Sequence, residues 1–153
     1  MSDTRDLSRR HEEAEAQVTS FRYAKPEGIA AGKGRVNLAK TDRIRGVVQI
    51  VKKDGGENNL HYHTNSDSIW MVLRGRIRFY GPDDKVIGEF GPSEGTITPA
   101  YSRYWFENVG DSEAEILQVM AMHDTRDNSS GRTDVSPQRF QIASMERYEA
   151  EKV

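Results

Sequence analysis

The chain has 153 residues, with 22 lysines and arginines against 24 aspartates and glutamates, and it contains no cysteine. This length suits one domain, and the nearly balanced charge gives no general attraction to nucleic acid or to an anionic membrane. Without cysteine there are no disulfides or thiolate nucleophiles, so any metal must be held by histidine, carboxylate or phenol oxygen. No stretch is apolar over the roughly 20 residues of a membrane span, and the N-terminus lacks the apolar region of a secretory signal. We therefore expect a cytoplasmic protein with no membrane or nucleic acid partner.

Charged residues are concentrated near both ends of the chain. The folded unit is expected over residues 21–125, between a charged N-terminal extension, 1–20, and a polar C-terminal extension, 126–153. Residues 6–18 predict a short charged helix with a thin apolar stripe. Residues 140–149 allow a terminal helix after Pro137.

The central region predicts short β-strands separated by glycine-containing turns. The expected strands cover residues 44–51, 69–80 in two halves divided by Gly75, 86–90, 95–99, 104–108 and 114–123. Short strands at regular spacing are typical of an antiparallel sandwich or barrel, and the absence of long helices between them disfavours a parallel sheet.

The clearest chemical signal is the pair His61 and His63, at the start of an expected strand. Alternation along a strand sends residues i and i+2 to the same side, so both imidazoles can converge on one point. Two neutral imidazoles suit iron, zinc, copper or nickel. The alternative is a pair of histidines that only form hydrogen bonds.

Two longer segments carry a resemblance. From Gly56 the chain reads G-E-N-N-L-H-Y-H-T-N-S-D-S-I-W-M-V-L-R-G, and from Gly95 it reads G-T-I-T-P-A-Y-S-R-Y-W-F-E-N. This pair resembles the two motifs of the cupin superfamily. The matching positions are Gly56, His61, His63, Gly75, Gly95, Pro99 and Asn108. The resemblance implies an all-β fold, an antiparallel jelly-roll β-barrel with short helical or disordered N- and C-terminal extensions.

The departures from the family pattern concern the metal ligands. Ser68 stands where the family has a glutamate, and Tyr104 stands where it has the histidine of the second motif. We expect a divalent transition metal (Fe, Zn, Mn or Ni) held by His61 and His63, with Asp67 or water completing the shell. A neutral phenol is more often a donor or general acid than a ligand, so Tyr104 is expected to act on the substrate together with the two histidines. His123 supplies a ligand only if its strand register points inward.

Aromatic residues are expected to contact the substrate. The candidates are Tyr62, Trp70, Tyr104 and Phe106. In the family register Trp70 faces inward, whereas strand alternation makes Ile69, Met71, Leu73, Ile77 and Phe79 the cleaner apolar face. If that series faces outward, a second copy of the chain would cover it, and we expect a homodimer.

Two functions are compatible with these residues. One is a metal-dependent small-molecule enzyme, in which Lewis-acid activation or enolate stabilisation by the metal supports lyase, isomerase, cyclase or dioxygenase chemistry. The other is a metal-free, non-catalytic cupin that binds a small ligand. The resemblance alone does not separate them, because one fold supports many functions.

Overall fold

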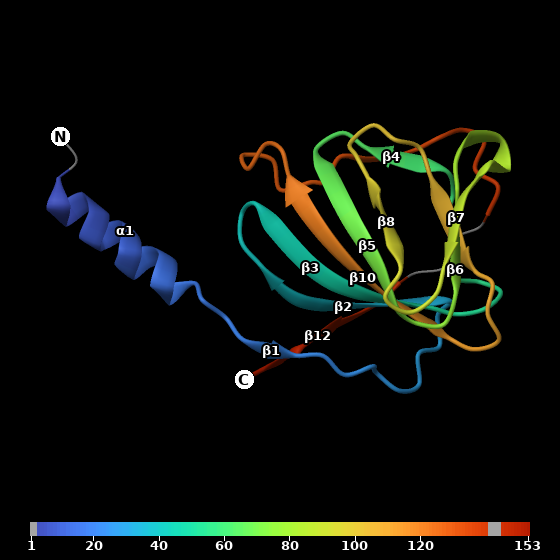
Figure 1. Ribbon diagram of the computed structural model, residues 1–153, viewed down its shortest axis with the longest axis horizontal. Coiled ribbons are helices and arrows are strands. Elements are labelled where there is room, and N and C mark those ends of the chain that lie inside the picture. The colour runs from blue at the N-terminus through green and yellow to red at the C-terminus, as the bar shows by residue number, and fades with distance from the viewer. Residues whose placement is uncertain (1–2, 141–144) are drawn as a thin grey trace.

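The computed structural model describes residues 3–140 and 145–153 as one helix near the N-terminus followed by short strands (Figure 1). The helix α1 is Thr4–Ala16, and a 3₁₀ turn, η1, is Pro82–Asp84. The strands are β1 Phe21–Arg22, β2 Lys33–Lys40, β3 Ile44–Val51, β4 His61–His63, β5 Ser66–Arg74, β6 Ile77–Tyr80, β7 Val86–Phe90, β8 Gly95–Thr98, β9 Trp105–Asn108, β10 Ala114–Met122, β11 Arg132–Asp134, β12 Glu146–Glu149 and β13 Glu151–Lys152.

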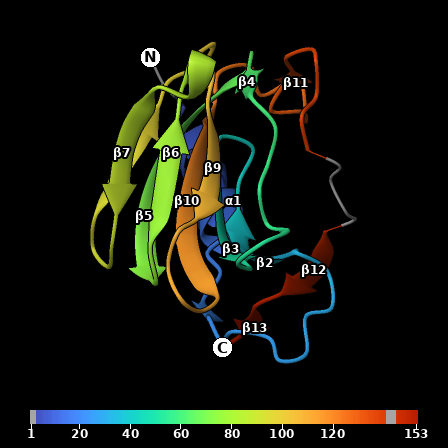
Figure 2. The ribbon, with the colours of Figure 1, turned by 90° about the vertical axis from the view of Figure 1, so that its right-hand side faces the viewer.

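The largest sheet has six strands in the order β12-β2-β3-β10-β5-β8. Its pairs are antiparallel except for β12, which runs parallel to β2. There is also a three-stranded sheet, β7-β6-β9, and a two-stranded pair, β11-β4 (Figure 2). A second two-stranded pair, β1-β13, joins the two ends of the chain. The jelly-roll prediction is thus confirmed, and all the strands expected between residues 44 and 123 are present within one to three residues of their expected ends.

An aromatic and aliphatic core lies between the large sheet and the β7-β6-β9 sheet. Trp70 and Val72 come from β5, Ile77 and Phe79 from β6, and Phe106 from β9, and all are almost fully buried. The rings of Trp70 and Phe79 meet edge to face with centroids 5.5 Å apart, a preferred aromatic geometry. This core forms one wall of the interior in which the two histidines lie.

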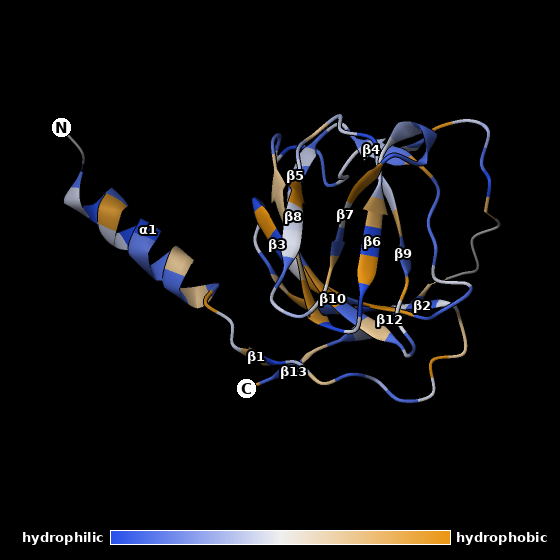
Figure 3. Cartoon of the chain, turned by 45° about the vertical axis from the view of Figure 1, so that its right-hand side comes forward, coloured by the Kyte–Doolittle hydropathy of each residue, from blue (hydrophilic) through white to orange (hydrophobic). Residues whose placement is uncertain are grey.

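A second apolar cluster covers part of the other face of the large sheet. Its buried members are Ile29, Val36, Leu38, Val48, Ile50 and Ala150. Tyr23 and Tyr148 pack against it, so segments from both ends of the chain cover the outside of β2 and β3. In contrast, α1 contributes no buried residue and extends away from the sheets (Figures 1 and 3).

The apolar residues of β5 and β6 do not form the single face expected from the sequence, and Gly75 is the reason. The series from Ile69 to Phe79 is not continuous, because Ile69 is 56% exposed whereas Phe79 is fully buried. Gly75 has φ +85° between β5 and β6, a backbone conformation that L side chains rarely adopt, and the alternation is reset there. Trp70, 3% exposed, therefore faces the interior, as the family register implied.

The two ends of the chain differ in how well the sequence predicted them. The N-terminal helix is present, and the Asp3 side chain accepts a hydrogen bond from the Arg5 N–H at its start. The terminal helix expected over 140–149 is wrong where the structure describes it: Glu146–Glu149 is strand β12, and 141–144 lie outside the described residues. No helix in the described part of the chain is both long and apolar enough to cross a membrane.

Candidate active site

Strand β4 places His61 and His63 on the same side of the chain. It pairs with β11 in the register His61↔Asp134 and His63↔Arg132, and an isolated bridge joins His61 to Tyr104. The two imidazole rings lie edge to face with centroids 5.2 Å apart. The sequence-based expectation that they converge is therefore met in the structure.

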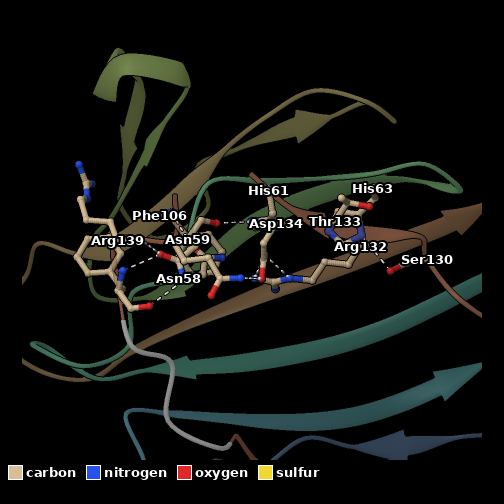
Figure 4. A network of polar contacts seen from close by, with 12 residues as sticks. Asn58, Asn59, His61, His63, Phe106, Ser130, Arg132, Thr133, Asp134 and Arg139 are labelled. Carbon is tan, nitrogen blue, oxygen red and sulfur yellow. Dashed lines mark hydrogen bonds and ion pairs between the residues drawn. The ribbon is translucent and has the colours of Figure 1, made fainter. Parts of the chain in front are cut away.

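Each imidazole is held through one ring nitrogen (Figure 4). The Nδ1 of His61 lies 2.7 Å from the backbone oxygen of Asn59, and the Nδ1 of His63 lies 2.9 Å from the Ser130 Oγ. A carbonyl oxygen only accepts, so the Nδ1 of His61 must carry the proton and its Nε2 keeps a free lone pair. Within the described residues, neither Nε2 makes a hydrogen bond. This is how proteins usually orient a metal-binding histidine.

Burial keeps both imidazoles neutral. It lowers the pKa of His61 to about 3 and that of His63 to about 4, and the nearby positive charge of Arg132 acts in the same direction. A neutral imidazole can bind a metal without first losing a proton. With such a low pKa, neither ring is a strong general base near neutrality.

Tyr104 is the third ring of the site. Its ring centroid lies 4.4 Å from that of His61, and the backbones of the two residues exchange hydrogen bonds of 3.1 and 3.0 Å. Burial raises the pKa of the Tyr104 phenol to about 12, against the opposing effects of a hydrogen bond with Thr98 and the charge of Arg132. Tyr104 is therefore a neutral phenol, able to donate a hydrogen bond.

The position of the family's glutamate is occupied by a polar network without charge. Ser68 is 3% exposed, and its Oγ accepts a hydrogen bond of 3.1 Å from the Gln118 Nε2. The Gln118 Oε1 in turn accepts one of 3.0 Å from the Gln49 Nε2. Hydroxyl and amide groups therefore stand here in place of the negative charge that a carboxylate would bring.

Asp67 does not join the two histidines. Its carboxylate accepts hydrogen bonds from the Ala100 N–H at 2.7 Å and from the His123 Nε2 at 3.1 Å, and its side chain is 43% exposed. It neighbours Ser68 on β5, so alternation turns it away from the interior. In residues 3–140 and 145–153, no three histidine, aspartate or glutamate side chains are grouped to hold a metal. His123, paired with Asp67, does not supply the missing ligand.

Comparison with known proteins agrees with this geometry. A family model described as Cupin matches residues 29–147, more than half of the chain. The chain is a cupin.

Several solved structures share its fold at low sequence identity. KdgF from a Halomonas species is 14% identical with a TM-score of 0.59, and the match covers 68% of this chain and 93% of that one. An uncharacterised protein with a double-stranded β-helix domain from Klebsiella pneumoniae is 18% identical with a TM-score of 0.59, covering 74% and 91%. An oxalate oxidase in complex with the substrate analogue glycolate is 18% identical with a TM-score of 0.57, covering 74% and 60%. Comparison with curated proteins finds no match.

The expected aromatic contacts of this cupin divide into two groups. Trp70 lines the interior, and its Nε1 donates to the Thr98 Oγ1 at 3.0 Å, while Phe106 is fully buried beside it. Tyr62 lies between the two histidines in sequence, so alternation turns it to the other side of β4. There it stacks on Tyr101 with ring centroids 6.2 Å apart. The structure thus brings Trp70 and Phe106 toward the site and leaves Tyr62 outside it.

The sequence analysis missed two basic side chains near the site, Lys33 and Arg132. The Lys33 Nζ lies 4.6 Å from the centroid of the Phe106 ring, and burial together with the charge of Arg132 lowers the pKa of Lys33 to about 7. Lys33 and Arg132 line the same 260 Å³ cavity, next to Asn58. Both come from strands that the sequence pattern did not predict, and no motif marks either residue.

Proposed function

We propose that this cupin is a small-molecule enzyme that uses a divalent transition metal held by His61 and His63. The observation that carries the proposal is the state of the two imidazoles: each Nδ1 is engaged, each ring is neutral, and each Nε2 has no partner within the described residues. Imidazole donors fit iron, zinc or nickel, and oxygen from water or substrate in the remaining positions would also suit manganese. When bound, the metal would supply Lewis-acid activation or enolate stabilisation, which would support lyase, isomerase, cyclase or dioxygenase chemistry.

The chain's own residues would supply orientation and a proton donor. The neutral Tyr104 phenol lies against His61 and can donate to a substrate oxygen as negative charge develops on it. The rings of Trp70 and Phe79 lie 6.0 and 5.9 Å from that of Tyr104 and would exclude water from this point. Lys33 and Arg132 line the adjoining cavity together with Glu57 and Asp134, and Arg132 forms an ion pair of 3.2 Å with Asp134, so the charge of this cavity is nearly balanced. The oxalate oxidase of similar fold, bound to glycolate, is a precedent for a small organic acid.

Metal analysis tests the proposal directly. Protein expressed in medium supplemented with the four metals should carry one transition metal per chain by elemental analysis. His61→Ala and His63→Ala should each lose it while remaining folded, because their ligand role is local. His123→Ala is the matched control, since His123 pairs with Asp67 and should leave the metal content unchanged. A wild-type protein without stoichiometric metal would overturn the proposal.

One observation favours a second candidate, a metal-free cupin that binds a small ligand. Ser68 and Tyr104 replace two ligands of the family pattern, and within the described residues no carboxylate is grouped with the two histidines so as to hold a metal. In that case His61 and Tyr104 would act only as hydrogen-bonding groups among buried aromatic side chains. The same measurement separates the two functions. The proposal also includes a cytoplasmic location and a homodimer, for which a surface is described in the Discussion.

A further inference from the structure

A second cavity, separate from the histidine site, lies along β2, β3, β12 and β13. Its volume is about 360 Å³, within the range of small-molecule sites. The polar residues that line it are Thr19, Arg35, Asn37, Lys40, Arg45, Arg147, Glu149 and Lys152. None of the residues assigned above to the histidine site is among its lining residues.

Three arginines from three strands meet at this cavity. Arg35 on β2 and Arg147 on β12 are direct neighbours across the parallel pair, and Arg45 comes from the start of β3. Two of these guanidinium groups act on the third: burial, Arg147 and Arg45 lower the pKa of Arg35, and Glu149 opposes them. Like charges placed side by side on a sheet are destabilising, so the cluster needs a compensating group.

The described residues provide little of that compensation. The ion pairs of residues 3–140 and 145–153 involve none of these three arginines. Glu149 is the one carboxylate among the lining residues described, and its Oε1 accepts a hydrogen bond of 2.9 Å from the Asn37 Nδ2. The cavity thus has five cationic side chains, the three arginines with Lys40 and Lys152, against one carboxylate.

The arginines also have unused donors. Arg35 donates from Nε to the Asn37 Oδ1 at 3.2 Å, and Arg45 donates from Nη2 to the Asn128 backbone oxygen at 2.6 Å. The Nε of Arg45 is buried and has no partner among the described residues. A buried donor without a partner is costly, and a bound anion that accepts from it would remove that cost.

We propose that this cavity binds a small organic polyanion, a phosphate ester or a polycarboxylate, through Arg35, Arg45 and Arg147. The guanidinium fork matches the oxygens of both carboxylate and phosphate and forms paired hydrogen bonds with either. Several cations facing one cavity favour a multiply charged ligand over a monovalent ion. The proposal does not depend on the function proposed for the histidine site.

Calorimetric titration at constant ionic strength tests the proposal. The probes are inorganic pyrophosphate for the phosphate class and citrate for the polycarboxylate class, with sodium chloride as the salt control. Binding of either probe, weakened at least tenfold in Arg35→Gln and in Arg147→Gln, is expected, and the tighter probe identifies the class. Arg9→Gln, on the exposed helix α1, is the matched control and should bind like the wild type. The proposal is overturned if neither probe binds, or if the cavity variants bind as tightly as the control.

A stability measurement guards against variants that simply fold poorly. Without an anion, Arg35→Gln should melt at a higher temperature than the wild type, because one of three like charges is removed. A merely structural arginine would give the opposite change. With the anion present, the wild type should gain thermal stability and the variant should not. His61→Ala should retain anion binding, so failure at the histidine site and failure at this cavity are distinguishable.

Discussion

At the residue scale, the protonation and the ring orientation of His61 and His63 result from burial and from hydrogen-bond partners that the sequence does not reveal. Asn59 is 2% exposed, and its side chain binds the Arg139 N–H, the Phe140 N–H and the Phe140 backbone oxygen. These bonds hold the segment whose backbone oxygen fixes His61. The His-x-His spacing predicted that the two rings converge, but their protonation depends on contacts with residues far along the chain.

The low pKa values predict how the metal-free protein responds to acid. In the unfolded chain a histidine titrates near pH 6.5, whereas in the folded protein His61 and His63 titrate near 3 and 4. The unfolded state therefore binds more protons below pH 6.5, and stability should fall as the pH drops toward 4. As the pH drops toward 4, these two groups should lower the free energy of unfolding of chelator-treated wild type by on the order of a few kcal/mol.

A variant without the two histidines separates their contribution to the pH dependence of stability from that of the carboxylates. Urea unfolding at several pH values should show a shallower loss of stability in His61→Gln/His63→Gln than in the wild type. Equal slopes in the two proteins would show that the imidazoles are not held neutral by burial.

Tyr104 gives a second residue-scale prediction. A phenol with a pKa of about 12 is neutral near pH 7, so it should act on the substrate without binding the ion. Tyr104→Phe should keep the fold and the metal while losing most of the activity or ligand affinity. Tyr104→His should bind metal more tightly, because it restores a third imidazole, and should also lose the native function.

Metal titration and absorbance spectroscopy measure these outcomes. The iron-loaded wild type should show no phenolate-to-iron absorption band, and the Phe variant should match it. Loss of the metal in Tyr104→Phe would instead make the tyrosine a ligand.

At the element scale, Gly75 decides which apolar residues of β5 and β6 face the interior. A Cβ added at Gly75 would lie 2.9 Å from the Ala114 Cβ and 3.0 Å from its Cα, and φ is +85°. Gly75→Ala should therefore destabilise the protein by about 1–3 kcal/mol, from backbone strain and from overpacking. Gly28→Ala is a useful control, because Gly28 has φ +70° with nothing within 4 Å of an added Cβ. It should cost only the strain, about 1 kcal/mol, in the same denaturation experiment. Equal costs would exclude a packing role for Gly75.

The strands that the sequence missed share a physical reason. Strand β2 has only two large apolar residues on its buried face, Val36 and Leu38, and its other face carries Lys33, Arg35 and Asn37, which line cavities. The missed strand β12 reads E-R-Y-E and is stabilised by its parallel pairing with β2. Period-2 patterning finds strands with an apolar face, and β12, at the edge of the large sheet, has only Tyr148 packed against an apolar cluster.

The sequence also predicted only part of the candidate site. The motifs located His61, His63, Ser68, Trp70 and Tyr104, because each lies in a strand or, for Tyr104, directly before one, and the family pattern fixes the register of these strands. They could not locate Arg132 or Ser130, which reach the histidines through the pairing of β11 with β4. That pairing joins segments about seventy residues apart and leaves no local pattern in the sequence.

At the scale of the whole molecule, the outer face of the large sheet is covered over only part of its width. The two ends of the chain cover β2 and β3, as Tyr23 and Tyr148 show. Farther along the same sheet, Ile69 on β5 lies opposite Ile97 on β8, and the two residues are 56% and 59% exposed. Leu73 on β5 is 38% exposed. Apolar side chains adjoining on neighbouring strands favour a self-complementary contact with a second copy.

This face yields the prediction of a homodimer. Light scattering at micromolar concentration should give twice the 17.4 kDa mass of the chain. Ile69→Glu should give a folded monomer, because a carboxylate there would be buried without a partner in the dimer. Ile87→Glu is the matched control: Ile87 is 48% exposed on β7, in the other sheet, and its replacement should leave the dimer intact. A monomeric wild type would remove the prediction, and a dimer that Ile69→Glu leaves unchanged would move the interface to another surface.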